Sequence, residues 1–185
     1  MSKIIFAFTG LLASGKDTAV HYFIEKYGAA SVKFSQPLRD ALDRFYVPHA
    51  RGNMQDLSTF LRERFGQDIL SRAIAKDAAA LDASVVVING VRRLSDIEHL
   101  QSLNGFCLVA IKADQKIRHR RLVARKENPD DGEKTWEQFC SDERAEAEIQ
   151  IPEVMQGARE TIDNNGTRDE LFVALDSLYQ RYAQG

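Results

Sequence analysis

The sequence is short of cysteine, of long hydrophobic runs and of any large excess of charge. Its two cysteines, Cys107 and Cys140, lie far apart among 185 residues and match no metal-ligand spacing, which indicates a reducing compartment. No basic segment precedes the first apolar run, and no run is long enough to span a bilayer. We therefore expect a cytoplasmic protein without a signal peptide or a membrane partner.

The formal net charge of −2 gives no reason to expect a nucleic-acid partner. The four histidines are scattered and fit neither a catalytic triad nor a metal site. No repeat or low-complexity tract interrupts the chain, and its 185 residues are enough for one domain with a buried core, so we expect a single domain over residues 1–185.

One loop stands out from this ordinary composition, the run Gly10-Leu11-Leu12-Ala13-Ser14-Gly15-Lys16-Asp17-Thr18. An apolar run at 4–8 precedes it and a helix-like stretch at 16–27 follows, which is the context of a phosphate-binding P-loop. Gly10 and Gly15 let backbone N–H groups turn toward phosphate oxygens, and the helix N-terminus adds further donors. Lys16 supplies a charge that reaches the terminal phosphates. The alternative, a chance glycine turn with an exposed lysine, does not explain the flanking strand and helix.

The rest of the chain alternates between apolar runs and helical patterns. Buried parallel strands are expected at 4–8, 85–88 and 106–111, and weaker ones at 30–34 and 160–163. Shared helical faces are expected for three sets of residues, Leu38, Leu42 and Phe45; Leu57, Phe60, Leu61 and Phe65; and Leu171, Leu175, Leu178 and Tyr182. This alternation predicts a doubly wound α/β fold with a five-stranded parallel sheet, whose ligands bind beyond the carboxyl ends of the strands.

The residues just after the strands are therefore the candidates for ligand binding. Arg39 follows the second strand and can grip a phosphate bidentately, the alternative being a surface ion pair with Asp43. The third strand ends in Asn89 where many P-loop enzymes have an aspartate that organises magnesium, and a neutral amide cannot offset charge. Gly90 allows a ligand to approach the backbone closely, and at least one of Arg92 and Arg93 is expected to meet an anion.

A basic helix is expected over 115–127, with Arg121 and Arg125 on one face. It precedes a polar stretch that we interpret as a mobile lid at about 127–137, which favours a role for these arginines in stabilising transition-state charge over that of an ordinary solvated face. Further candidates in and beyond the lid are Asp130, Asp131 and Arg144. Glu143, Glu146 and Glu148 are expected to be solvated.

These motifs together resemble the nucleoside monophosphate kinase superfamily. The resemblance rests on the P-loop, on Ser35-x-x-Leu38-Arg39-x-Ala41, on Gly90-x-x-Arg93 and on Arg121-x-x-x-Arg125. The form Ser14-Gly15-Lys16-Asp17-Thr18, with Phe65-Gly66-Gln67-Asp68-Ile69-Leu70, is similar to the phage-type deoxynucleoside monophosphate kinases. The ending from Thr161 to Leu171 is similar to both those kinases and the dephospho-CoA kinases, and Leu61-Arg62-Glu63 and Gly90-Val91-Arg92 resemble an archaeal group of kinase-like proteins.

The resemblance implies a P-loop kinase that uses ATP and Mg²⁺. It places the ATP phosphates against Gly10, Ala13, Ser14, Gly15, Lys16, Asp17 and Thr18. It implies that Thr18 ligates magnesium, and that Asp17 holds magnesium-bound water or polarises the acceptor phosphate. Catalytic roles fall to Lys16, Asp17, Arg121 and Arg125, and acceptor binding to Ser35, Arg39, Arg62, Gly90, Arg92 and Arg93.

The acceptor is expected in the region of about 35–83, where Arg62, Arg64 and Arg72 are candidates for base recognition over 51–83. The expected reaction is phosphoryl transfer to a (deoxy)nucleoside monophosphate, by a monomer or a homodimer. Dephospho-CoA kinase-like transfer to a ribose hydroxyl stays open because Asp17 can serve as a base. A nucleotide-binding regulator without transfer activity stays open because of Asn89, and so does a kinase for another phosphorylated metabolite.

Overall fold

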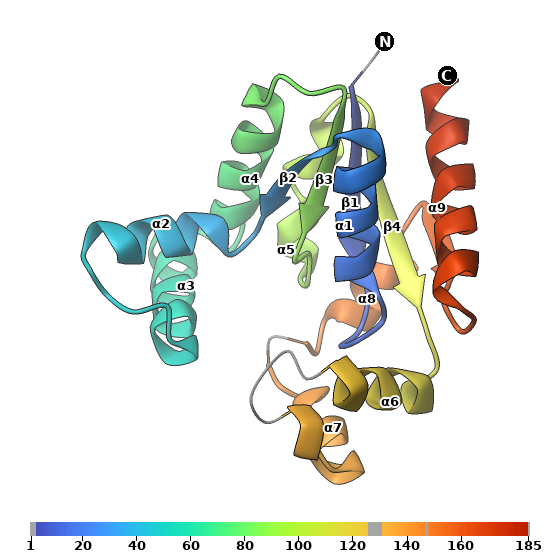
Figure 1. Cartoon of the computed structure of the whole chain (residues 1–185). Helices are drawn as coiled ribbons and strands as arrows, with labels where there is room; N and C mark the ends of the chain where they lie inside the picture. Colours follow the sequence, from blue (N-terminus) through green and yellow to red (C-terminus); the bar gives the residue numbers. More distant parts are fainter. Residues whose placement is uncertain (1–2, 126–130, 147, 185) are drawn as a thin grey trace.

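The computed structural model describes residues 3–125, 131–146 and 148–184 of the chain. In this part of the chain, parallel strands form a five-stranded sheet in the order β2-β3-β1-β4-β5 (Figure 1). The strands are β1 (Ile4–Thr9), β2 (Ala30–Lys33), β3 (Val85–Asn89), β4 (Phe106–Lys112) and β5 (Glu160–Asp163). The α/β fold with a five-stranded parallel sheet is confirmed, and the expected strands agree with the observed ones to within one residue at each end.

Helices fill the connections between the strands. They are α1 (Lys16–Tyr27), α2 (Gln36–Arg44), α3 (Arg51–Phe65), α4 (Ile69–Ala80), α5 (Leu94–Ile97), α6 (Gln115–Arg125), α7 (Trp136–Asp142), α8 (Ile151–Gln156) and α9 (Arg168–Ala183), with short 3₁₀ turns η1 (Leu100–Ser102) and η2 (Asp131–Glu133). The expected basic helix at 115–127 is observed as α6 over Gln115–Arg125, and positions 126 and 127 lie outside the described residues. No helix of the described residues is long and apolar enough to cross a membrane.

Two apolar layers hold the sheet between helices because alternate strand residues point to opposite faces. On one face, Phe6 and Phe8 of β1 pack with Phe23 of α1 and Leu175 of α9. On the other face, Ile5 and Ala7 of β1 pack with core residues of α4, α5 and α8, which are Leu70, Ile74, Ala75, Ala78, Ile97 and Val154. The expected apolar face at Leu171, Leu175 and Leu178 is confirmed as buried.

Three of the expected apolar face residues lie on the surface instead. Phe45 has 75% of its surface exposed, Phe60 58% and Phe65 54%. Helices α2 and α3 form an arm that projects to one side of the sheet (Figure 1), so only their inner residues reach the core. Leu38 and Leu42 are buried, and Leu57 and Leu61 pack against the core from α3.

The carboxyl ends of β2, β3 and β1 lie next to one another, because Asn89 of β3 is paired with both Phe8 and Lys33. The segments that follow these three strands therefore meet at one edge of the sheet. In Figure 1, α6 and α7 lie beyond this same edge. The fold thus gathers the P-loop, the turn at 90–93, the start of α2 and the basic helix around one place.

Candidate active site

The loop between β1 and α1 has the backbone conformation of a phosphate cradle. Gly10 and Gly15 have φ values of 154° and 106°, and Ala13 also has a positive φ, of 58°. A Cβ on Gly15 would lie 2.3 Å from the Asn164 Nδ2 atom, and one on Gly10 would lie 2.5 Å from the Ile111 carbonyl oxygen. Both positions therefore require glycine, for conformation and for space.

A cavity of about 460 Å³ lies over this loop and the first turn of α1. Its lining combines the P-loop with the α6 and β5–α9 segments, namely Ala13, Ser14, Gly15, Lys16, Asp17, Thr18, Arg121, Asn164, Gly166, Arg168 and Leu171. Within the described part of the chain, the buried Ser14 Oγ atom has no hydrogen-bond partner. A phosphate oxygen would satisfy this hydroxyl, and the three cationic side chains of the lining would attract a polyphosphate. The residues present are therefore suited to bind the phosphates of a nucleoside triphosphate.

Arg121 closes one side of this cavity. Its guanidinium donates to the carbonyl oxygens of Asn164 at 2.7 Å and Gly166 at 2.9 Å. Burial, followed by the charge of neighbouring Arg120, lowers the pKa of this guanidinium. Arg121 is thus tied to the loop after β5.

Asn164 lies in the motif from Thr161 to Leu171, and the sequence alone assigned it no role at the site. It is buried, and its Nδ2 atom donates to the Ser14 carbonyl oxygen at 2.8 Å. Because Arg121 holds the Asn164 carbonyl, one residue joins the P-loop to the basic helix. Its position directly after the fifth strand, at the ligand-binding edge, was the available signal.

The two residues that depart from the usual P-loop pattern contact each other. The Asn89 Nδ2 atom at the end of β3 donates to the Asp17 Oδ1 atom in the first turn of α1, at 2.7 Å. Asp17 is exposed and lines the cavity beside Lys16 and Thr18. The described residues contain no cluster of three or more histidine, cysteine, aspartate or glutamate residues that could form a protein-only metal cage. Mg²⁺ commonly uses one or two protein ligands and completes its shell with phosphates and water, and Asp17 and Thr18 fit that requirement.

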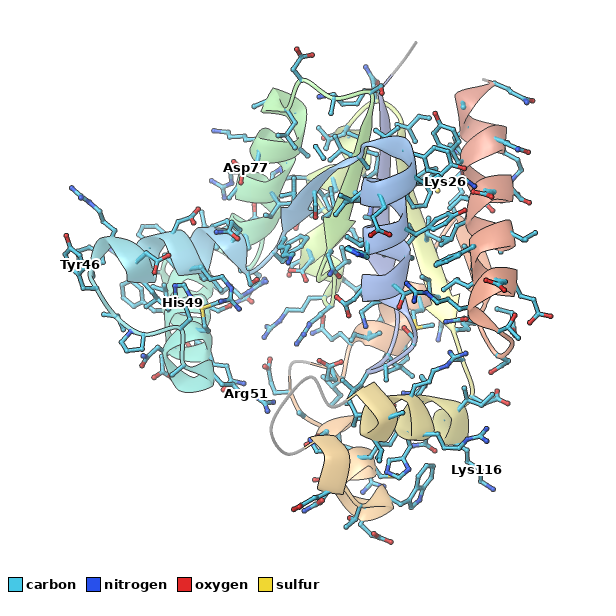
Figure 2. The ribbon with its side chains drawn as sticks, in the orientation of Figure 1. Lys26, Tyr46, His49, Arg51, Asp77 and Lys116 are labelled. Atoms are coloured by element: carbon cyan, nitrogen blue, oxygen red, sulfur yellow. The ribbon has the colours of Figure 1, made fainter. Side chains whose placement is uncertain are left out.

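Arg39 in α2 does not form the surface ion pair with Asp43 that was its alternative to phosphate binding. Its guanidinium contacts the His49 Nδ1 atom at 3.1 Å, while the His49 Nε2 atom contacts Asp43 at 2.7 Å. Figure 2 shows His49 between α2 and α3. Arg39 is thus held by a histidine and not by a carboxylate. Ser35 precedes the same helix at the end of β2.

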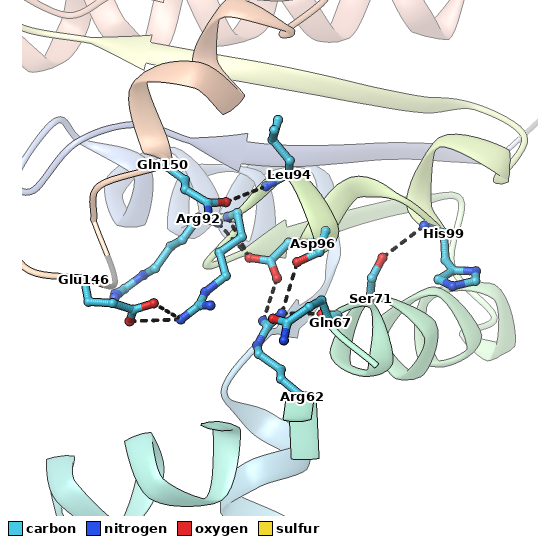
Figure 3. Close-up of polar contacts among 11 residues, drawn as sticks. Arg62, Gln67, Ser71, Arg92, Leu94, Asp96, His99, Glu146 and Gln150 are labelled. Atoms are coloured by element: carbon cyan, nitrogen blue, oxygen red, sulfur yellow. Dashed lines mark hydrogen bonds and ion pairs between the residues drawn. The ribbon is translucent and has the colours of Figure 1, made fainter. Parts of the chain in front are cut away.

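Arg92 and Arg93 are each paired with a glutamate of the segment after α7, and Figure 3 shows the two hydrogen bonds made by Glu146. Arg92 lies 2.8 Å from Glu148, and the Arg93 NH2 atom donates to both carboxylate oxygens of Glu146, at 2.7 and 3.0 Å. The expectation that these glutamates are solvated is wrong for Glu148, whose side chain is 16% exposed, and holds for Glu146, whose side chain is 75% exposed although it is paired. Both arginines reach a carboxylate, which has the charge and shape of part of a phosphate.

Arg62 also differs from its expected role in acceptor binding. Its side chain is buried and its guanidinium donates to the Asp96 Oδ1 atom at 2.7 Å, as Figure 3 shows. Asp96 also accepts from the backbone N–H groups of Arg92 and Arg93 through its second oxygen. Arg62 therefore supports the turn that carries Arg92 and Arg93. Arg72 of α4 pairs with Asp68, which directly precedes this helix, and Arg64 is exposed on α3.

Arg118 of the basic helix is the buried support of the P-loop. It donates to the Leu12 carbonyl oxygen at 3.1 Å, to the Ala113 carbonyl oxygen and to Glu143. Glu143 was also expected to be solvated, and this ion pair corrects that expectation. A second cavity of about 470 Å³ lies beside Arg118, between the end of β4 and α8, but it includes neither Lys16 nor Thr18.

Several residues that were expected at the site lie outside the described part of the chain, and one is exposed away from the cavity lining. The side chains of Arg125 and Asp131, all of Asp130, and most of the lid segment before Asp131 fall outside the described residues. Arg144 is exposed after α7. The lid at about 127–137 and the catalytic role of Arg125 thus stay predictions.

The glutamate that holds Arg93 gives one testable consequence. If the acceptor anion binds Arg93, it must first displace Glu146, so Glu146→Gln is expected to lower the acceptor KM about two- to fivefold, in line with the modest strength of an exposed ion pair. Steady-state kinetics at saturating ATP measure this change. Glu153→Gln, at an exposed position of α8, is the matched control, and an unchanged or raised acceptor KM for Glu146→Gln would contradict the expectation.

Comparison with known proteins shows to which family the chain belongs. No protein-family model matches the chain. It is 31% identical over 175 residues to a UPF0200 protein of Thermococcus kodakarensis, covering 92% of this chain and 93% of that protein. The chain belongs to the UPF0200 family. Another UPF0200 protein, from Pyrococcus furiosus, is 28% identical over 187 residues, covering 98% of this chain and 99% of that one.

Solved structures similar to this UPF0200 chain include kinases. A Thermus thermophilus protein, TT1252, superposes with a TM-score of 0.63 at 18% identity, over 98% of both chains. A shikimate kinase from Bacteroides thetaiotaomicron gives a TM-score of 0.60 at 15% identity, over 96% of both chains. A gluconokinase from Sinorhizobium meliloti gives 0.55 at 15% identity, over 98% of this chain and 97% of that one. At these identities the likeness shows the fold, which is that of the P-loop kinases.

Proposed function

We propose that this UPF0200 protein is a kinase that transfers the γ-phosphoryl group of ATP to the phosphate of a (deoxy)nucleoside monophosphate. The observation that carries the proposal is the arrangement of charge around the P-loop. A cavity with Lys16, Arg121 and Arg168 lies on one side, and Arg39, Arg92 and Arg93 follow the two strands on the other side. A donor and a phosphorylated acceptor would thus meet above the P-loop.

The chemistry asks little of the protein beyond alignment and charge. The attacking oxygen of a monophosphate is already anionic, so no strong general base is required. Lys16 and the P-loop N–H groups would hold the β- and γ-phosphates, while Arg121 holds the donor from the β5–α9 side. Asp17 and Thr18 would hold a Mg²⁺ ion, which neutralises charge on the phosphates when it is bound. The lid segment would exclude water that otherwise hydrolyses ATP.

The Asp17–Asn89 contact supports a second candidate, transfer to a hydroxyl of an acceptor such as dephospho-CoA. A hydroxyl nucleophile needs a base, and Asp17 is a carboxylate at the cavity beside Lys16. The acceptor arginines favour the monophosphate, because three guanidinium groups suit a compact dianion. The two candidates differ in the acceptor group and not in the donor site.

An acceptor panel tests the proposal. ATP consumption with Mg²⁺ is measured against each ribo- and deoxynucleoside monophosphate, dephospho-CoA and no acceptor. We expect diphosphate formation with one or a few monophosphates. Turnover with dephospho-CoA alone would favour the second candidate, and nucleotide binding without turnover on any acceptor would favour a regulator.

A further inference from the structure

The residue types in the first turn of α1 and at the end of β3 differ from those of the usual P-loop pattern. P-loop enzymes commonly place a hydroxyl directly after the lysine and a carboxylate at the end of the strand beside β1, and the two together organise Mg²⁺. Here the carboxylate, Asp17, follows Lys16, and the amide, Asn89, ends the strand. The structure brings these two side chains into a hydrogen bond of 2.7 Å, so they occupy one place at the site.

The charge of Asp17 needs an explanation at this position. It lies at the N-terminus of α1, in the lining of the cavity that Lys16, Arg121 and Arg168 make positive. An uncompensated carboxylate beside polyphosphate oxygens repels them, whereas a divalent cation between the two groups removes the repulsion. One oxygen of Asp17 accepts from Asn89, which leaves the second oxygen of this exposed side chain for a ligand in the cavity that it lines.

We propose that Asp17 supplies the metal-organising carboxylate of this site in place of the residue at the end of β3, and that Asn89 is the positioning residue that orients it. The amide donates one hydrogen bond and adds no charge, so the site keeps a single carboxylate, moved from the strand to the helix. This inference rests on the proposed use of ATP with a divalent cation and deepens it. It does not depend on which acceptor the enzyme uses.

The hydrogen bond between Asn89 and Asp17 can be tested by exchanging the two residue types, which moves the carboxylate from one position to the other. Asp17→Asn removes the carboxylate with little change of shape, Asn89→Asp adds a second carboxylate facing the first, and the double variant reverses donor and acceptor at unchanged net charge. Binding of an ATP analogue with a non-transferable γ-phosphate is measured by calorimetry with Mg²⁺ and with a chelator. The ratio of the two dissociation constants reports the metal-dependent part of binding, and Mn²⁺ electron paramagnetic resonance reports bound metal directly.

The expected effects of Asp17→Asn have opposite signs in the two conditions. With Mg²⁺ the analogue binds more weakly, and with the chelator it binds as well as or better than to wild type, because a negative charge beside the phosphates is gone. We expect the metal-dependent ratio to fall at least about tenfold, as for loss of groups that hold metal ligands. The double variant is expected to regain most of the ratio. Asp77→Asn, at an exposed position of α4 away from the site (Figure 2), should leave both constants unchanged.

Two results would overturn the inference. One is an unchanged metal-dependent ratio in Asp17→Asn, and the other is a double variant no better than Asp17→Asn. If the double variant fails to fold, Asn89→Ala takes its place, since loss of the positioning bond is expected to lower the ratio and an unchanged ratio would contradict it. Wild-type protein that does not bind the analogue would instead overturn the proposed function, so the two failures are distinguishable.

Discussion

Lys16→Ala is expected to abolish phosphoryl transfer. Lys16 is the P-loop lysine, it lines the donor cavity, and its Nζ atom donates to the Leu11 carbonyl oxygen of the same loop. Removal of one preorganised charge that faces the developing transition state typically costs about 10²–10³ in kcat, and we expect a loss at least that large. The measurement is steady-state turnover with the preferred acceptor.

The matched control for this variant is Lys76→Ala, at an exposed position of α4 that is not part of the cavity lining. We expect wild-type turnover for the control and an unchanged melting temperature for both variants. Turnover within a few fold of wild type in Lys16→Ala would remove the P-loop from the mechanism, and with it the proposed function.

Asp96→Ala is expected to cause the largest loss of stability. Asp96 is 2% exposed, and it accepts from Arg62 at 2.7 Å and from the backbone N–H groups of Arg92 and Arg93 at 2.9 and 3.0 Å. Without it the buried Arg62 charge loses its partner, which typically costs about 3–5 kcal/mol in the free energy of unfolding. Urea denaturation measures this change.

A double-mutant cycle separates the ion pair from the turn that it supports. Arg62→Met leaves no unpaired cation, so Arg62→Met with Asp96→Ala should cost less than the sum of the single variants. The acceptor KM should rise in Asp96→Ala, because the N–H groups that it holds belong to Arg92 and Arg93. Asp77→Ala is the control, and a cost below about 1 kcal/mol for Asp96→Ala would contradict a supporting role.

The positions of the strands along the chain and the P-loop could be predicted because local sequence determines them. Residues 4–8 and 85–88 are buried on both sides and therefore read as continuous apolar runs, and Gly10 and Gly15 occupy backbone conformations that only glycine adopts readily. The rule that ligands meet the carboxyl ends of parallel strands then placed Asn89 beside the loop, where the structure has it in contact with Asp17.

The partners of the charged side chains could not be predicted in the same way. Glu146 and Arg93 are 53 positions apart and meet because the segment after α7 returns to the turn after β3, which no local pattern encodes. Likewise, periodicity identified a face containing Phe60 and Phe65 but not what covers that face, and the α2–α3 arm leaves both exposed. Arg62 read as a free cation because its partner, Asp96, lies 34 positions away in another helix.

Phosphorus magnetic resonance of the reaction product tests the central claim most directly. The protein is mixed with ATP, Mg²⁺ and the monophosphate with which it consumes ATP fastest, and the new phosphorus signals are assigned. Transfer to a phosphate predicts loss of the acceptor's monoester signal and, beside the doublets of ADP, two further coupled doublets from the P–O–P linkage of the acceptor diphosphate; these changes should be absent with Lys16→Ala. A second monoester signal beside ADP, with the acceptor's own monoester retained, would show transfer to a hydroxyl, and inorganic phosphate beside ADP with an unchanged acceptor would show hydrolysis; either result would contradict the proposed reaction.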